Sequence, residues 1–216
     1  MRRFLLLTII ALSAATDACA QLRYGIDLGL NLSHLSLSKS VVDTRNRAGF
    51  FLGPKLHAKI PKLGLGADVA LRYAQKNTAI EVWGQTGSEV YEKEKMSYIE
   101  VPLNVRWDIN ILKALGIFIY TGPQWDWYIG PGTWEGIDHY GVDQFKATFN
   151  HHTLSWNVGA GVILFKRLHI SVSHSIPITE QGSFLSTAYN TVVQHVEELD
   201  MKNYTWQLTL DFYFNK

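Results

Sequence analysis

Residues 98–109 read Tyr-Ile-Glu-Val-Pro-Leu-Asn-Val-Arg-Trp-Asp-Ile and decide the fold class. Every second residue from Ile99 to Ile109 is apolar, whereas Glu100, Arg106 and Asp108 fall between them. Successive side chains of a β-strand point to opposite sides, so this period of two predicts a strand with one apolar and one polar face.

The same alternation returns in seven other segments, and no long segment has the spacing of an amphipathic helix. The seven segments are residues 23–33, 50–60, 65–74, 115–129, 153–165, 168–178 and 203–214. Three connections are short, at residues 61–64, 110–114 and 166–167, and four are long, at residues 39–47, 75–97, 130–152 and 179–202. Short turns on one rim and long loops on the other are typical of outer-membrane barrels. We therefore predict an all-β fold, an eight-stranded antiparallel up-and-down transmembrane β-barrel.

The polar row of these strands carries balanced charge, whereas the apolar row contains no Asp, Glu, Lys or Arg. Five cations and six anions make up the charged set: Arg23, Asp27, Lys55, Lys59, Asp68, Arg72, Glu100, Arg106, Asp108, Asp126 and Asp211. A charge facing lipid costs about 2–4 kcal/mol at mid-bilayer, so we predict that this row lines the lumen as an ion-pair network. Alternation alone leaves an inverted alternative open, a soluble lipocalin-like barrel that carries an apolar ligand.

Aromatic residues of the apolar row gather at the strand ends. Near the long-loop rim these are Phe50, Tyr73, Trp125, Trp127, Tyr204 and Trp206, and near the short-turn rim they are Tyr24, Trp107, Phe212 and Phe214. Two such groups indicate the aromatic girdles of a membrane protein.

Three features resemble one known family. They are an early Gly-x-x-x-Gly-x-Asn strand (Gly25, Gly29 and Asn31), the Tyr-Ile-Glu-Val-Pro-Leu segment at residues 98–103, and an aromatic last strand that ends near Phe214. The whole chain is similar to the PorT-like outer-membrane β-barrel family of Bacteroidetes-type bacteria, although Asn215 and Lys216 extend past the aromatic end. The resemblance implies an outer-membrane location, and the best-known member assists a secretion system. No residue of this chain carries that role over.

The first twenty residues predict a secretory signal peptide cleaved after Ala20, with a basic start at Arg2 and Arg3 and an apolar run from Phe4 to Ala15. Residues 21–216 then form one barrel domain without Cys19 and with no net charge. Acylation of Cys19 is an alternative that fits poorly, because Thr16 stands where a lipobox has an aliphatic residue. Lys plus Arg is 20 and Asp plus Glu is 19 in the full chain, so no basic excess favours nucleic acid.

Catalytic and metal-binding patterns are weak. His169 and Ser171 share one strand face, and outer-membrane lipid A deacylases use a similar pair with a carboxylate, for which Glu180 is the candidate. The alternative of an envelope lipid-modifying enzyme is disfavoured, since Val172 stands where such enzymes have Asn and His169 lies near the periplasmic rim. His151-His152 and Asp138-His139 lack metal-ligand spacing, so we expect no metal and no cofactor.

Exposed aromatic residues in the long segments suit contact with a partner, namely Trp83, Tyr91, Trp134, Tyr140 and Tyr189. Alternatively, these segments are strand extensions with solvated charges. We predict a non-catalytic outer-membrane protein whose external loops contact another envelope component or assist secretion. Expected partners are outer-membrane lipid and an envelope or secretion-system protein, and no nucleic acid.

Overall fold

The computed structural model describes residues 21–37, 42–44, 47–60, 63–84, 87–112, 114–137, 144–190 and 193–215. Thirteen strands run through these residues. They are β1 (Gln21–Leu37), β2 (Val42–Thr44), β3 (Arg47–Lys59), β4 (Leu65–Ala70), β5 (Arg72–Gly84), β6 (Gly87–Asn110), β7 (Leu115–Tyr128), β8 (Thr133–Ile137), β9 (Gln144–Phe149), β10 (His152–Leu164), β11 (Leu168–Pro177), β12 (Gly182–Asn190) and β13 (Val193–Tyr213).

The wall of the barrel has eight antiparallel strand positions, and they close into a ring. β1 pairs with β3, β3 with β4 and β5, these with β6, and the wall continues through β7, β10 and β11 to β13, which pairs back with β1. β4 and β5 form one wall strand interrupted at Leu71, opposite Pro54, whose ring nitrogen has no hydrogen to donate. The predicted eight-stranded antiparallel barrel is confirmed.

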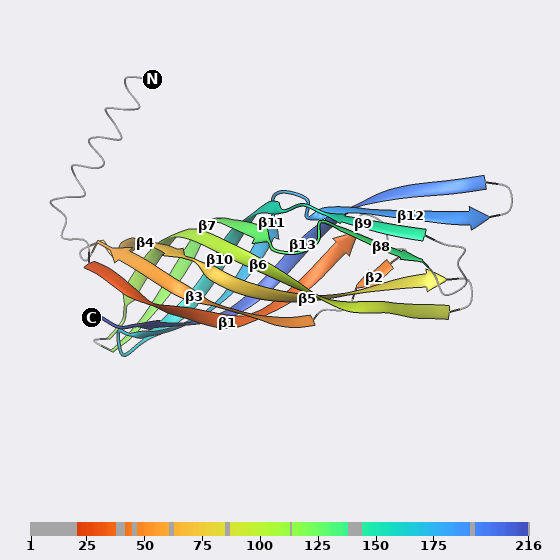
Figure 1. Cartoon of the computed structure of the whole chain (residues 1–216). Coiled ribbons are helices and arrows are strands. Elements are labelled where there is room, and N and C mark those ends of the chain that lie inside the picture. The colour runs from red at the N-terminus through yellow and green to blue at the C-terminus, as the bar shows by residue number, and fades with distance from the viewer. Residues whose placement is uncertain are drawn as a thin grey trace, which may run out of the picture.

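Long hairpins project from one end of the barrel (Figure 1). β5 and β6 continue to Gly84 and Gly87, and β13 begins at Val193 and pairs there with β12. β12 pairs in turn with β9, and β9 pairs with β8. The prediction that residues 75–97, 130–152 and 179–202 are loops is therefore wrong for much of their length, and the alternative that these segments are strand extensions is confirmed for the described residues. These segments have no continuous apolar row, because a hairpin beyond the membrane needs none, and so the alternation signal fades although the strands continue.

The opposite end carries tight turns and both ends of the described chain (Figure 1). Phe165 and Lys166 have positive φ angles of 52° and 65° in the β10–β11 turn, where Arg167 N–H donates to Leu164 O. Positive φ at both central residues is the type I′ geometry that matches strand twist. Asn215 joins the last strand to the first, since its side chain accepts from Tyr24 N–H and donates to Leu22 O.

The outer surface of the barrel wall is apolar and its interior is polar. Leu103, Val105 and Trp107 are 53%, 62% and 49% exposed, whereas their neighbours Asn104, Arg106 and Asp108 are almost completely buried. A lipocalin-like carrier has the opposite arrangement. Among the described residues, no helix is long and apolar enough to cross a membrane.

Candidate functional site

The barrel interior holds six Lys or Arg and six Asp or Glu side chains, each at most 8% exposed among the described residues. Eleven are the charges predicted from the sequence, and the twelfth is Lys76 on β5. Sequence alternation missed Lys76 because the strand was expected to end at residue 74. The signal that could have found it is that polar residues on this face recur at even-numbered positions, from Asp68 through Arg72 to Lys76. With Lys76 the interior charges balance.

The buried charges form an ion-pair network in the lumen, and Asp27 and Lys55 make most of the contacts in its middle part. Lys55 Nζ lies 2.7 Å from Asp211 Oδ2 and 3.4 Å from Asp27 Oδ2. Arg72 Nη2 donates to the same Asp27 oxygen at 2.7 Å, and Arg72 Nη1 donates to Gln207 Oε1 at 3.2 Å. The ion pairs therefore connect β1, β3, β5 and β13 across the lumen.

Arg106 is the centre of the network at the short-turn end of the barrel and is fully buried. Its Nε donates to Asp108 Oδ1 at 2.6 Å, and its Nη1 lies 3.5 Å from Asp68 Oδ2. Lys59 Nζ is 3.0 Å from Asp108 Oδ2, and His57 Nδ1 is 2.5 Å from Asp68 Oδ1. Both carboxylates thus keep a second partner besides Arg106.

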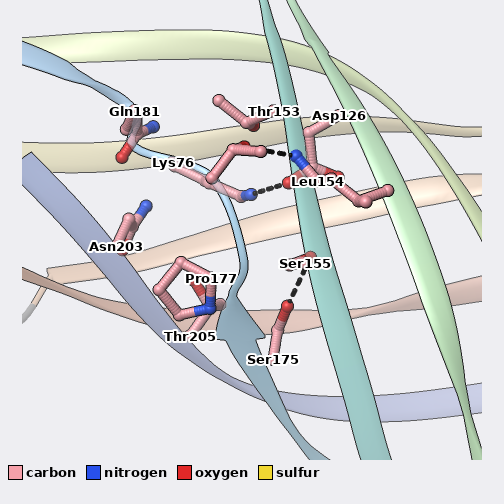
Figure 2. Close-up of a pocket in the computed structure, with 11 residues that line it drawn as sticks. Lys76, Asp126, Thr153, Leu154, Ser155, Ser175, Pro177, Gln181, Asn203 and Thr205 are labelled. Atoms are coloured by element: carbon pink, nitrogen blue, oxygen red, sulfur yellow. Dashed lines mark hydrogen bonds and ion pairs between the residues drawn. The ribbon is translucent and has the colours of Figure 1, made fainter.

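Lys76 organises the external part of the network. Its Nζ lies 2.8 Å from Glu100 Oε1 and 3.1 Å from Asp126 Oδ2, and it sits 4.7 Å from the centre of the Tyr98 ring. Figure 2 shows Lys76 and Asp126 at one side of a polar pocket, the empty space of which is about 320 Å³ when counted out to the solvent. The pocket is lined mainly by hydroxyl and amide side chains: Thr153, Ser155, Ser175, Thr179, Gln181, Asn203 and Thr205.

Aromatic rings fill the remaining interior where glycines leave room. Phe118 supports the Arg106 guanidinium at 3.6 Å, and a Cβ at Gly161 would lie only 2.5 Å from the end of that ring. Phe51 lies against Arg72 in the same way, beside Gly29. A lumen filled by paired charges and rings is expected for a barrel of this size.

Arg23 stands apart from the ion pairs. It donates to Lys166 O and to Gln21 Oε1, both at 3.2 Å, and among the described residues no carboxylate lies within ion-pair distance of it. Two neutral oxygens at the short-turn end hold this cation, so it is not part of the connected network.

His169 and Ser171 both point into the lumen, and no hydrogen bond joins them in the described part of the chain. The His169 Nδ1 accepts from Arg106 Nη2 at 2.9 Å, while its Nε2 has no hydrogen-bond partner among described residues. The Ser171 hydroxyl contacts Tyr120 at 3.4 Å, and Glu180 is exposed in the segment after β11. Among the described residues, the geometry gives Ser171 no base and the histidine no orienting carboxylate.

The predicted contact residues fall on the projecting strands. Trp83, Tyr91, Trp134 and Tyr189 belong to β5, β6, β8 and β12, whereas Tyr140 lies outside the described residues. Asp138 and His139 also lie outside them. Within the part of the chain that is described, no group of three or more His, Cys, Asp or Glu side chains could hold a metal ion.

A family model for the outer membrane protein beta-barrel domain matches residues 14–180. The chain belongs to this family. Membership supports a location in the outer membrane. In outer-membrane barrels the short turns face the periplasm and the longer connections lie outside, and the two ends of this barrel correspond to that arrangement. No curated protein matches the chain.

Several solved outer-membrane structures are similar to this barrel at low identity. OprG from Pseudomonas aeruginosa is 10% identical with a TM-score of 0.43, covering 90% of this chain and 95% of its own. Ail of Yersinia pestis is 13% identical with a TM-score of 0.41, covering 89% and 98%. The outer membrane protease OmpT from Escherichia coli is 10% identical with a TM-score of 0.38, covering 91% and 97%. At this distance no role passes from these proteins to the present chain.

Proposed function

We propose that this outer-membrane barrel is a non-catalytic anchor that presents its external hairpins to another envelope component. The observation that carries the proposal is the contrast between the two parts of the molecule. The lumen is filled by twelve charges and their supporting rings, whereas the β5–β6 and β12–β13 hairpins extend far beyond the wall (Figure 1). Nine residues of β12, at about 3.3 Å each, span about 30 Å.

The proposal also includes the finer assignments that the sequence suggests. The chain is exported, and residues 1–20 are removed by cleavage after Ala20. It is a PorT-like barrel, an assignment supported by the strand with Gly25, Gly29 and Asn31 and by the segment at residues 98–103. Assistance to a secretion system is one form of the interaction. Sequencing the N-terminus of the outer-membrane form tests the cleavage site, because the expected first residue is Gln21.

A photo-crosslinking amino acid placed at Tyr189 or Tyr91 in intact cells tests the anchor function. A discrete adduct of higher mass is expected from these hairpin positions. The matched control is Val105, which is 62% exposed on the lipid-facing wall and should give no such adduct. The same product from Val105, or none from the hairpins, would contradict the proposal.

The enzyme alternative has its own test in Ser171→Ala. Because no described residue acts as a base for Ser171, envelope lipid composition should be the same in cells carrying the variant and in wild-type cells. A change in acyl-chain composition in the variant would restore the enzymatic hypothesis.

A further inference from the structure

The projecting strands form two separate sheets beyond the barrel mouth. One sheet joins β8, β9, β12 and the first part of β13, and the other joins β2, β5 and the first part of β6. Among the described residues, no backbone pairing connects the two sheets beyond the wall. Figure 1 shows them at the hairpin end as an upper group with β8, β9 and β12 and a lower group with β2 and β5.

The two sheets rise from opposite sides of the mouth. In one direction around the wall, β7, β10 and β11 separate β6 from β13. In the other direction they are separated by β1, β3 and the broken strand of β4 and β5. Whatever lies on the axis beyond the lumen is therefore flanked by both sheets.

One face of the first sheet carries an apolar row that crosses all four strands. The register aligns one residue from each strand: Trp134, Ala147, Phe184 and Leu199. Directly paired residues of an antiparallel sheet lie on the same face, so these four share one face. The neighbouring row on the opposite face is mostly charged: Glu135, Lys146, Leu185 and Glu198. The apolar row exists only across the register, since no single strand carries it along its length.

This apolar row lies on the side of the barrel axis. Thr205 on β13 is 2% exposed in the lumen, and the pairing of β13 with β1 and β12 continues to its first residue without a register shift. Alternate residues of a strand lie on the same side, so Leu199 is on the lumen side of its sheet. Phe149, which is 3% exposed and 5.8 Å from Tyr128 between ring centres, lies on the same face of β9 as Ala147.

The second sheet also has apolar residues on the side of the barrel axis. On β5, Arg72 and Lys76 are buried in the lumen, and the even-numbered positions continue through Ile80 and Val82. The register shift between Thr78 and Ile80 adds a residue to β6, so the alternation of β5 is kept. The residues paired with Ile80 and Val82 share this face: Thr44, Tyr91, Val42 and Glu89.

We call these two axis-facing surfaces, the row from Trp134 to Leu199 and the rows through Ile80 and Val82, the axial faces. The charged residues paired into them are all acidic among the described residues: Glu89, Glu94 and Glu197. No Lys or Arg is paired into an axial face beyond the wall in the described part of the two sheets. Charges of opposite sign meet across protein interfaces, so apolar rows with acidic positions fit an apolar segment that carries Lys or Arg. An anionic group would be repelled.

The anchor function proposed above leaves the chemistry of the partner open, and the present inference rests on that function. We propose that the axial faces together bind one polypeptide segment of another envelope protein, in which Lys or Arg residues are interspersed with apolar ones. The apolar residues of the segment lie along the rows at Phe184 and Ile80, and its cations pair with the acidic positions. The segment ends at the mouth, because the lumen below is filled by charges that are costly to separate.

Photo-crosslinking from neighbouring positions of one strand tests this inference in intact cells. The crosslinking amino acid replaces Phe184 or Leu199 on an axial face. The matched controls are Leu185 and Glu198 on the opposite face, and all four positions lie away from the hairpin tip. Adduct yield should be at least about fivefold higher at the axial positions, since each control is next to its test residue but on the other side of the strand.

The possible failures of this experiment are distinguishable. Equal yields from both faces, or a higher yield from Leu185 and Glu198, would overturn the inference and leave the anchor function standing. The absence of an adduct from every hairpin position would contradict the anchor function itself and this inference with it.

The identity of the crosslinked product shows what lies between the sheets. Tandem mass spectrometry after chymotryptic digestion should give a peptide of another protein that contains Lys or Arg among apolar residues. A peptide without such cations would overturn the inference. A product that joins Phe184 to the β5–β6 hairpin of the same chain would also overturn it, because the axial faces would then cover each other.

Charge reversal tests the acidic positions. Glu89→Lys/Glu197→Lys should lower the adduct yield at Phe184 at least about fivefold, because two attractive contacts become repulsive. The matched control Glu81→Lys/Glu198→Lys makes the same change of charge on the opposite faces and should leave the yield unchanged. No loss in the first variant, or an equal loss in the control, would refute the inference. A heat-dependent shift on a denaturing gel verifies that each variant is folded.

Discussion

Arg106→Met should destabilise the barrel strongly. The guanidinium makes a 2.6 Å hydrogen bond to Asp108, donates to His169 at 2.9 Å and lies 3.5 Å from Asp68. Breaking a buried ion pair by removing one partner costs about 3–5 kcal/mol, because the other charge stays behind. Asp108 keeps Lys59 and Asp68 keeps His57, so the lower end applies. We expect a loss of about 3 kcal/mol in the free energy of unfolding, or about a hundredfold in the folded-to-unfolded ratio.

Reversible urea unfolding in phospholipid vesicles, followed by tryptophan fluorescence, measures this loss. Val105→Leu is the matched control, because it changes the neighbouring residue on the lipid face and should stay within about 0.5 kcal/mol of wild type. A loss below about 1 kcal/mol for Arg106→Met is the magnitude of an exposed ion pair. That result would refute the reasoning, since it would mean that water in the lumen screens these charges.

Three further outcomes follow from the same structure. Lys76→Met should lower the free energy of unfolding, and the double variant Lys76→Met/Glu100→Gln should recover part of that loss. A double-mutant cycle should give a coupling energy of about 0.5–3 kcal/mol, and strictly additive effects would argue against the ion pair between Lys76 and Glu100. Leu208→Arg, in the middle of the part of β13 that pairs with β1, should cost about 2–4 kcal/mol in vesicles, whereas Leu22→Arg at the end of β1 should cost about 0–1 kcal/mol. Equal costs would contradict the membrane position of the wall. Lys166→Gly should raise the free energy of unfolding by up to about 1 kcal/mol, because relief of about 1–2 kcal/mol of left-handed strain at a φ of 65° exceeds the entropy cost of glycine, about 0.5–1 kcal/mol. Destabilisation would show that this turn geometry is wrong.

The wall of the barrel could be predicted from the sequence because lipid acts on every second residue. The alternation in residues 98–109 survives since a misplaced charge at Arg106 or Asp108 would face hydrocarbon. Strand order followed from the connections, because consecutive antiparallel strands pair with their neighbours. The closing β1–β13 pair completed the same rule.

For the external segments the sequence left two alternatives open, loops and strand extensions, and alternation could not decide between them. Beyond the membrane neither face of a hairpin is selected by lipid, so β12, with the sequence Gly-Ser-Phe-Leu-Ser-Thr-Ala-Tyr-Asn, has no continuous apolar row. Lys76 was also missed, because the apolar alternation fades there and the strand was expected to end two residues earlier. Its side chain nevertheless lies in the lumen. The partners of individual charges also depend on register across non-neighbouring strands, as in the contact between Lys55 and Asp211.

The lumen holds paired charges and the hairpins project from it, and this division predicts that substitutions in the two parts will have different effects. Interior substitutions act on charges that neutralise one another. A variant such as Asp27→Asn therefore changes the free energy of unfolding but leaves every residue of the external surface unchanged. Changes at Tyr91 or Tyr189 lie far along hairpins that the barrel wall does not need for closure. If the barrel is an anchor, the hairpin variants lose partner contact at unchanged unfolding free energy, and the interior variants lose stability first. Variants that lost partner contact through interior residues at unchanged stability would place the function in the lumen.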